Sequence, residues 1–305
     1  MKFDVVTFGS AVKDVFVGTD LAERGNFIAY PTGTKILINQ LRYDIGGGGT
    51  NTAVAFSRFG LNTGFIGKVG GDASGEEILE MLKDEKVKFL GKVDKEGLTG
   101  FSVILDSKEN NRTVLTYKSI NNFIKMRDIK FNKLNTKWVY CSSMLGESLD
   151  TQISTVRKLK IKGAKIAYNP SSYLTNKRHL IEPLLTMSDI LILNKEEAAM
   201  LTKSKDSIKG LHNLTGGIVV ITDKNKKISA YDGEKKYCLM PNKIKAKERT
   251  GAGDAFASGF VAGQIVGMSI KESLKLGLKE SESVIKYFGA KNNLLRIDLK
   301  KIKRG

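Results

Sequence analysis

Short apolar, β-rich runs alternate along the chain with longer segments in which apolar residues recur every three or four positions. The runs predict strands at Phe3–Phe8, Gly64–Val69, Lys137–Ser142, Lys165–Tyr168, Ile190–Leu193 and Ile218–Thr222. The longer segments predict helices at about 51–60, 75–86, 150–162, 195–202, 254–267 and 270–288. Because strands alternate with helices, we expect an α/β fold with a mostly parallel sheet and helices on both faces.

Three regions break this alternation, and each predicts strands without intervening helices: Val12–Val17, Lys35–Tyr43 and Thr99–Lys118. The last has the pattern of a hairpin, with apolar runs at 100–105 and 112–117 around a polar turn at 106–111. We expect a single domain over 1–305, with a small antiparallel sheet inserted at about 12–18, 34–45 and 98–118. Such a sheet can cover a site and exclude water, or it can simply extend an edge of the main sheet.

Composition narrows the class of protein. The 305 residues are 41% hydrophobic, enough for one large α/β domain. The sequence has neither a stretch of about 18 apolar residues nor a leader-like N-terminus, so we expect a cytoplasmic protein without a membrane partner. Cys141 and Cys238 lie in strand-like apolar contexts, which predicts two buried free thiols.

Charge and histidine content restrict the chemistry. The net charge is +18, from 50 Lys and Arg against 32 Asp and Glu. The lysines are scattered and no nucleic-acid-binding motif is present, so we expect a solvated basic surface and no nucleic-acid partner. His179 and His212 have no partner at the spacing of a catalytic triad or zinc site. Acid–base catalysis is therefore expected to depend on carboxylates.

The segment 249–256, Arg-Thr-Gly-Ala-Gly-Asp-Ala-Phe, carries the clearest chemical signal. Gly251, Ala252 and Gly253 lead into an apolar helical run, and the free N–H groups at a helix start bind phosphate-like charge. Asp254 stands beside this predicted anion site and can take a proton from a neighbouring hydroxyl. An anion site next to a base suits phosphoryl transfer to an alcohol.

A second signal is the run of four glycines at 46–49, which opens the predicted helix at 51–60 with Thr50 as a candidate N-cap. No Gly-Lys-Ser/Thr follows, so the run is not a P-loop. It also lacks the spacing of a dinucleotide-binding fingerprint. Taken alone, such a run is more often a turn or hinge than a ligand-binding loop.

Four motifs occur in a fixed order: Gly9-Ser10 with Asp14, a Gly-Gly-x-x-x-Asn run ending at Asn51, an Asn-x-x-Glu at 194–197, and Gly-Ala-Gly-Asp at 251–254. In this combination the sequence resembles the ribokinase-like (PfkB) carbohydrate kinase family over essentially its whole length. The resemblance implies a three-layer α/β/α fold with a central, mostly parallel sheet and a small β-sheet lid. It also implies ATP-dependent transfer of the γ-phosphate to a hydroxyl of a sugar, sugar phosphate or nucleoside.

The resemblance implies roles for the matched residues. Asp254 would be the catalytic base, and Gly251, Ala252 and Gly253 would form the anion hole for the moving phosphoryl group. The residues implied in acceptor binding are Asp14, Gly47, Gly48 and Asn51. Arg112, on the predicted lid, would either touch a substrate phosphate or be solvated, and both readings stay open.

The donor side is implied in the same way. Asn194 and Glu197 would position Mg²⁺ and phosphates, with Glu197 acting through water because Mg²⁺ dehydrates reluctantly. Thr222 and Asn293, together with Gly251 and Gly253, would contact the nucleotide. The stretch 287–293 falls where the family closes over adenine.

The chain also departs from the family pattern. The nucleotide loop at 223–227 reads Asp-Lys-Asn-Lys-Lys without glycines, so ATP is the default donor rather than an established one. Glu248 stands where the family often has Asp, and Arg249 replaces a small polar residue, which leaves K⁺ dependence open. Gly48 occupies a position that is Lys in ribokinase, which favours an acceptor other than ribose.

Two further questions remain open from the sequence. A non-catalytic sugar or nucleoside binder, or a nucleic-acid-associated protein, could reuse the same fold, although the intact Gly-Ala-Gly-Asp argues against both. The apolar runs at 101–105 and 113–117 would permit a homodimer through the lid.

Overall fold

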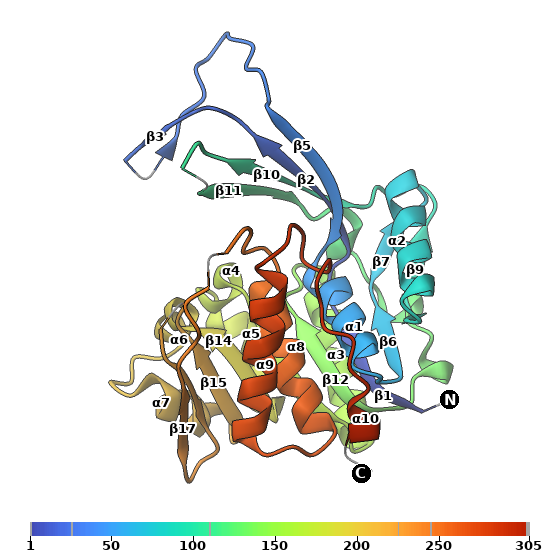
Figure 1. Cartoon of the computed structure of the whole chain (residues 1–305). Helices are drawn as coiled ribbons and strands as arrows, with labels where there is room; N and C mark the ends of the chain where they lie inside the picture. Colours follow the sequence, from blue (N-terminus) through green and yellow to red (C-terminus); the bar gives the residue numbers. More distant parts are fainter. Residues whose placement is uncertain (1, 26, 110, 225, 245, 303–305) are drawn as a thin grey trace.

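The structure, a computed structural model, describes residues 2–302 apart from 26, 110, 225 and 245, and nine of the described strands form the central sheet (Figure 1). Their order is β17-β16-β15-β14-β13-β12-β1-β6-β8. Neighbours pair in parallel except at β16, which is antiparallel to both β15 and β17. The strands are β1 (Phe3–Phe8), β6 (Thr63–Ile66), β8 (Lys88–Phe89), β12 (Thr136–Ser142), β13 (Lys165–Asn169), β14 (Ile190–Asn194), β15 (Ile218–Thr222), β16 (Ile228–Tyr231) and β17 (Lys236–Leu239).

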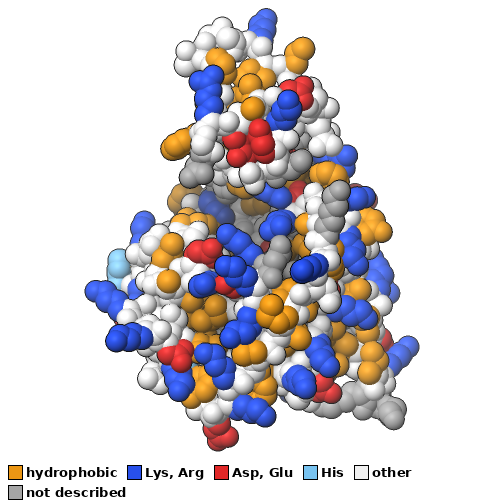
Figure 2. Space-filling model, turned by 60° about the vertical axis from the view of Figure 1, so that its left-hand side comes forward, with side chains coloured by type: hydrophobic (Ala, Val, Ile, Leu, Met, Phe, Trp, Pro, Cys, Tyr) orange, Lys and Arg blue, Asp and Glu red, His pale blue; other side chains and the backbone are white. Residues whose placement is uncertain are grey.

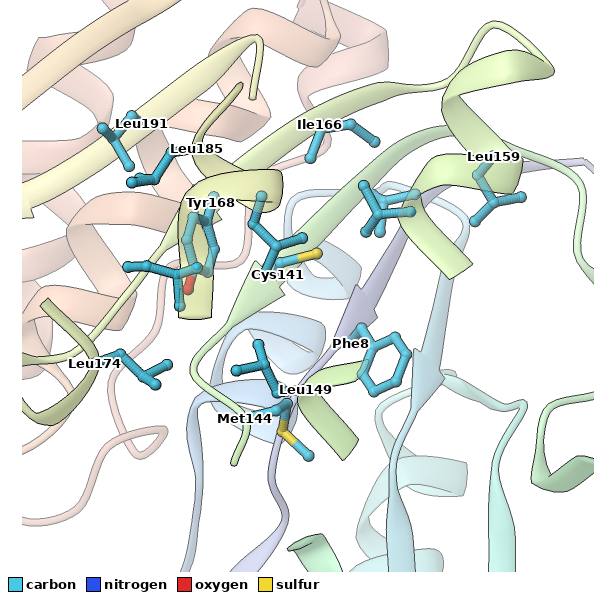
Figure 3. Packing of buried hydrophobic residues seen from close by; sticks show 14 of the residues in the cluster. Phe8, Cys141, Met144, Leu149, Leu159, Ile166, Tyr168, Leu174, Leu185 and Leu191 are labelled. Carbon is cyan, nitrogen blue, oxygen red and sulfur yellow. The ribbon is translucent and has the colours of Figure 1, made fainter. Parts of the chain in front are cut away.

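Helices cover both faces of this sheet. One face packs against α1 (Gly48–Arg58), α8 (Ala252–Ile265) and α9 (Ile270–Val284) through a core that includes Phe56 and Phe260. The other face carries α3 (Glu147–Ile161), α4 (Ser172–Thr175), α5 (Arg178–Met187), α6 (Lys195–Leu201) and α7 (Ser207–Thr215). Figure 3 shows the packing of this second core around Phe8, Cys141 and Tyr168. The predicted three-layer α/β/α arrangement is confirmed.

The remaining helices, turns and small ladders flank the sheet. The helix α2 (Ala73–Asp84) packs its buried residues Ile78 and Leu82 against Phe65 of β6 and Val69 of β7 (Lys68–Gly70). Single 3₁₀ turns lie at Ser119–Asn122, Met126–Asp128 and Phe131–Lys133, and α10 (Leu299–Ile302) lies near the C-terminal end of the chain. Two small ladders pair β7 with β9 (Lys92–Asp94) and β3 (Glu23–Arg24) with β4 (Phe27–Ile28). Within the described residues, no helix is both long and apolar enough to cross a bilayer.

The lid is a separate sheet in which four described strands follow the order β11-β10-β2-β5. They are β11 (Arg112–Tyr117), β10 (Gly100–Asp106), β2 (Val12–Gly18) and β5 (Gln40–Gly46). Figure 1 shows this sheet standing above the main domain, over the N-terminal ends of α8 and α1. The predicted sheet is confirmed, but it is mixed rather than antiparallel, because β2 and β10 run in parallel. The two strands reach the lid from separate points of the chain, so no tight turn forces them to be antiparallel.

Alternation along the lid strands gives the sheet two different faces. Asp14 of β2 lies in register with Ser102 of β10, which in turn pairs with Thr116 of β11, and all three line a cleft below. The neighbouring positions belong to the opposite face, where Tyr43 and Leu115 are exposed. Because successive side chains of a strand point to opposite faces, the face that carries Asp14 looks at the main domain and the face that carries Tyr43 and Leu115 looks away from it.

Some sequence predictions were incomplete or wrong. The strand predicted at Lys35–Tyr43 begins only at Gln40, and α5, α7 and the hairpin β16–β17 were not predicted. Pro183 lies inside α5, and a proline normally signals the end of a helix. Cys238 is exposed rather than buried. It lies on β17, an edge strand of the sheet whose alternate side chains point to solvent. Cys141 is a buried free thiol, as predicted.

Candidate active site

A cleft of about 620 Å³ lies between the lid and the main domain. Its floor is made by residues at, or just after, the carboxyl ends of parallel strands. They are Ser10 after β1, Ser142 and Ser143 at the end of β12, Asn169 at the end of β13, Asn194 at the end of β14 and Thr222 at the end of β15. Carboxyl ends of parallel strands form the usual ligand-binding edge of an open α/β sheet.

The N-terminus of α8 opens into this cleft through Gly251, Ala252 and Gly253. Gly251 has φ of +78°, and a side chain there would also collide with Ala290. The Ala252 N–H bonds the Arg249 carbonyl, whereas the N–H groups of Gly253 and Asp254 find no acceptor among the described residues. A Cβ at Gly253 would meet no atom within 4 Å, so free amides border open space there. This is the geometry of an anion site.

Asp254 occupies the first turn of α8 and is partly exposed to the cleft. Its Oδ2 accepts a hydrogen bond from Asn51 Nδ2 at 2.8 Å. Its Oδ1 lies toward Gly48, 3.6 Å from the position that a Cβ would take there. The surrounding protein raises the pKa of Asp254 by desolvation, while Asn51, Lys291 and Lys118 act to lower it. One oxygen is therefore held by the protein and the other is available to a ligand.

Asp14 projects from the lid into the same cleft. Burial raises its pKa to about 6, against the opposing effects of Lys291, the Ser102 hydroxyl and Lys118; Asp44, directly opposite on β5, adds to the increase. Gly46 makes this placement possible, because a side chain at that position would collide with the Asp14 carboxylate. The second glycine of the run, Gly47, and Gly48 line the cleft next to it.

The other half of the cleft is suited to a nucleotide. Asn194 caps α6 and accepts from the Glu197 N–H at 2.9 Å, and Glu197 Oε2 accepts from the Asn194 N–H at 2.9 Å. This capping box leaves the other Glu197 oxygen without a hydrogen bond to any described residue, and burial raises the pKa of Glu197. Lys224, from the loop that lacks glycines, lines the cleft and lies 3.3 Å from Glu196. The apolar wall nearby consists of Ile228, Pro241, Ile244, Leu278 and Ile285.

Three predicted site residues do not line the cleft. Asn51 is buried beneath it, with both ends of its amide bonded to protein. Arg112 reaches from β11 to Glu248 and to the Thr250 hydroxyl. Asn293 bonds the Ser283 carbonyl and hydroxyl at 2.9 Å, at the end of α9.

The predicted donor segments are only partly in place. The described residues that line the cleft include none from the stretch 287–293, which was expected near adenine. Instead, the Arg42 guanidinium of the lid lies 4.0 Å from the centre of the Phe288 ring. Asn225, in the middle of the nucleotide loop, lies outside the described residues.

Other cleft residues were missed from the sequence. The Ser142 Oγ is buried without a hydrogen-bond partner among the described residues, although it borders the cleft next to Gly48. Lys118, directly after β11, brings a cation into the acceptor half. The strand-end rule could have found Ser142. The sequence places Lys118 among several basic residues near the predicted lid, but no local signal separates it from the other lysines.

Within the described residues, no three His, Cys, Asp or Glu side chains form a cluster suited to a metal. Glu197 offers one carboxylate oxygen to the donor half of the cleft. This sparse set fits Mg²⁺, which keeps most of its waters and is held mainly by substrate phosphates.

A parallel sheet with a sheet-like lid, together with an anion-binding helix start beside a carboxylate, defines the class of small-molecule phosphotransferases. Residues 3–296 match the family described as pfkB family carbohydrate kinase, and the chain belongs to this family. An uncharacterized sugar kinase of Archaeoglobus fulgidus is 26% identical to it over 252 residues, which cover 80% of this chain and 99% of that protein.

Solved structures share the fold. Adenosine kinase from Sinorhizobium meliloti superposes with a TM-score of 0.85 at 21% identity and covers 100% of both chains. A putative ribokinase II from E. coli, in complex with ATP and Mg²⁺, has a TM-score of 0.82 at 17% identity and covers 98% of this chain and 97% of its own. ATP-dependent phosphotransfer to a sugar or nucleoside is thus the general activity of this chain's family.

Proposed function

We propose that the protein transfers the γ-phosphate of ATP to a hydroxyl group of a sugar or sugar phosphate, with Asp254 as the base. One observation carries this proposal: the available Oδ1 of Asp254 and the free amides at the start of α8 face the same cleft. A base and an anion site in one cleft are what in-line phosphoryl transfer to an alcohol requires.

The residues divide the reaction between them. Asp254 accepts the proton of the acceptor hydroxyl through Oδ1 while Asn51 holds Oδ2 in place. The hydroxyl oxygen then bonds to the γ-phosphorus, and the bond from phosphorus to the bridging oxygen of ADP breaks. The start of α8, from Gly251 to Gly253, forms the anion site, and the free amides of Gly253 and Asp254 stabilise the charge on the moving phosphoryl group.

On the donor side, Asn194 and Glu197 would hold the phosphates, and Glu197 would hold Mg²⁺ through water. When bound, Mg²⁺ neutralises charge on the phosphates. The E. coli neighbour in complex with ATP and Mg²⁺ supports this donor. Thr222 and Lys224 border the same region and provide a hydroxyl and a cation.

The lid favours a sugar-like acceptor over a nucleoside. Its cleft face offers Asp14, Ser102 and Thr116, which suit vicinal hydroxyls. Three lid aromatics, Tyr43, Phe101 and Tyr117, lie on the opposite face. A fourth, Phe16, shares the face of Asp14 but is buried and does not line the cleft, so none of these four offers a platform for a base. The Lys118 ammonium lies 5.4 Å from the centre of the Tyr173 ring and has no ion pair among the described residues, so its charge is available to an anionic group on the acceptor.

The test is nucleotide-dependent phosphorylation of a panel of pentoses, hexoses, their phosphates and nucleosides. ATP, GTP and ADP serve as donors with Mg²⁺, each with and without K⁺. We expect turnover of a sugar or sugar phosphate with ATP. Turnover confined to nucleosides would overturn the acceptor assignment, and a folded protein that binds no nucleotide would overturn the kinase assignment.

A further inference from the structure

A buried lysine lies beneath the cleft. Lys291, after α9, is only 5% exposed. Its Nζ donates to the Ile45 carbonyl at the base of the lid strand β5, and to Asn51 Oδ1 at 2.6 Å. A buried ammonium is costly unless it is paired and hydrogen-bonded, so a position of this kind needs an explanation.

The hydrogen bonds define a relay from Lys291 to Asp254. An ammonium group can only donate, so the Asn51 oxygen must face Lys291. The Asn51 amide nitrogen then faces Asp254 Oδ2, to which it donates at 2.8 Å. If Asn51 turned over, its oxygen would face the Asp254 carboxylate and the two acceptors would repel each other. Lys291 therefore fixes which end of the amide meets Asp254.

The charges around Lys291 point to the same site. Burial lowers the pKa of Lys291 to about 8, while Asp44, Asp14 and Asp254 act to raise it and Arg58 acts to lower it. Asp14 faces the acceptor, and Asp254 is the proposed base. Lys118 also lowers the pKa of Asp254. The Asp254 charge in turn adds to the raised pKa of the buried Tyr140 hydroxyl, which is due mainly to desolvation. The single buried ammonium of Lys291 thus interacts electrostatically with three carboxylates at the base of the lid and in the cleft.

We propose that Lys291 is a positioning residue that, through Asn51, orients Asp254 and keeps it ionised, and that ties this arrangement to the lid through Ile45. The inference rests on the proposed function, because it assigns a partner to the proposed base. It revises the role expected for Asn51, which holds the base rather than the acceptor.

The experiment is a double-mutant cycle of Lys291→Met, Asn51→Ala and the combined variant. If Lys291 acts through Asn51, the two losses in kcat will not add. We expect each single change to lower kcat about 10- to 100-fold, as for a small misplacement of a catalytic group. We expect the combined variant to be little worse than either, with the KM for ATP unchanged. Additive losses would overturn the proposal.

A matched control shows what loss of any buried lysine does. Lys68 is 7% exposed, pairs with Asp94 at 3.0 Å and donates to the Phe123 carbonyl, away from the cleft. Lys68→Met should unfold at a lower temperature than the wild type while keeping its kcat. If it loses as much kcat as Lys291→Met at equal folded fraction, the loss is not specific to the lysine beneath the cleft and the proposal fails.

A second readout does not depend on turnover. The Asp254 carboxyl group is followed by ¹³C NMR during a pH titration of the wild type and of Lys291→Met. Because the lysine charge favours the carboxylate, its removal should shift the Asp254 titration to higher pH. The acidic limb of kcat/KM should move in the same direction. An unmoved Asp254 titration would sink the proposal, even if no acceptor had been found and the kinase function itself were in question.

Discussion

At the scale of single residues, Asp14 and Asp254 are acids that the protein holds partly out of water on two sides of one cleft. Both pKa values are raised by desolvation, and Lys291 and Lys118 oppose the increase at both. Asp14 belongs to the lid and Asp254 to α8, so the two carboxylates come together only when the lid and the main domain are both in place.

The Asp14→Asn variant should be more stable than the wild type above pH 6. The pKa of Asp14 in the folded protein, about 6, lies above the ordinary 3.8, so the wild type loses stability as pH rises through this interval. We expect a higher melting temperature for the variant at pH 8, and a difference that narrows as the pH falls to 4. The exposed control Asp84→Asn should show no such narrowing. A lower melting temperature for Asp14→Asn at pH 8 would contradict the assignment.

The Gly253→Ala variant should separate activity from stability. A methyl group there meets no protein atom within 4 Å, and alanine favours the helix by up to about 1 kcal/mol. The methyl would occupy the space proposed for the phosphoryl group, so we expect kcat/KM to fall at least about 10-fold without loss of thermal stability. The control is Lys271→Ala, at the equivalent exposed position of α9. Full activity in Gly253→Ala would remove the anion site from this position.

The sequence predicted only part of the site at this scale. Two parts of the site are continuous in the sequence and could be recognised there: residues 251–254 and the glycines at 46–49. Lys291 lies 240 positions from Asn51 and meets it only through the folding of the lid base onto the end of α9. Arg112 was expected either to touch a substrate phosphate or to be solvated, and neither expectation included its contact with Glu248.

At the scale of elements, β11 of the lid is joined to the segment that precedes α8. Arg112 contacts Glu248 and Thr250, and Glu248 also accepts from the Arg249 and Thr250 N–H groups at 2.7 and 2.8 Å. These bonds lower the pKa of Glu248 despite its burial. The contact therefore couples the position of the lid hairpin to the start of the proposed anion site.

The Arg112→Ala variant should loosen this connection. We expect faster amide hydrogen exchange in β10, β11 and residues 248–251, and a higher KM for the acceptor, because the hairpin loses its fixed contact with the main domain. The control is Arg178→Ala, which removes a surface pair with Glu182 on α5. Unchanged exchange in the hairpin would show that other contacts hold the lid.

Element prediction succeeded where the pattern was long and local. The strands of the parallel sheet are short apolar runs that local composition reveals, and β1 and β15 were predicted with the bounds observed. The hairpin β16–β17 pairs two strands of only four residues each, too short for their pattern to be read with certainty. The strand order of the lid depends on pairing between distant segments, for which periodicity carries no information.

At the scale of the whole molecule, two features of the surface stand out. Lys and Arg side chains are spread over the face shown in Figure 2, with Asp and Glu among them. The outer face of the lid is instead apolar, with Tyr117, Tyr43 and Leu115 each more than half exposed and Leu41 and Phe101 beside them. Several exposed apolar side chains on one face of a sheet commonly mark an interface. We propose that a second copy of the chain covers it.

A charge placed on this face should prevent the association. We expect the wild type to sediment as a dimer at micromolar concentration and Tyr43→Glu to sediment as a monomer, because a buried unpaired carboxylate opposes pairing. The control is Ile161→Glu, which changes an exposed apolar residue of α3 away from the lid. A monomeric wild type would exclude the proposed dimer.

The measurement that tests the account most directly is the turnover of Asp254→Asn with the best acceptor of the panel. Asparagine keeps the size of the side chain but cannot accept the proton at neutral pH. We expect kcat/KM to fall at least about 100-fold, with ATP binding by calorimetry and the melting temperature close to those of the wild type. Turnover near the wild-type rate in a folded variant would show that Asp254 is not the base, and the proposed mechanism would be wrong.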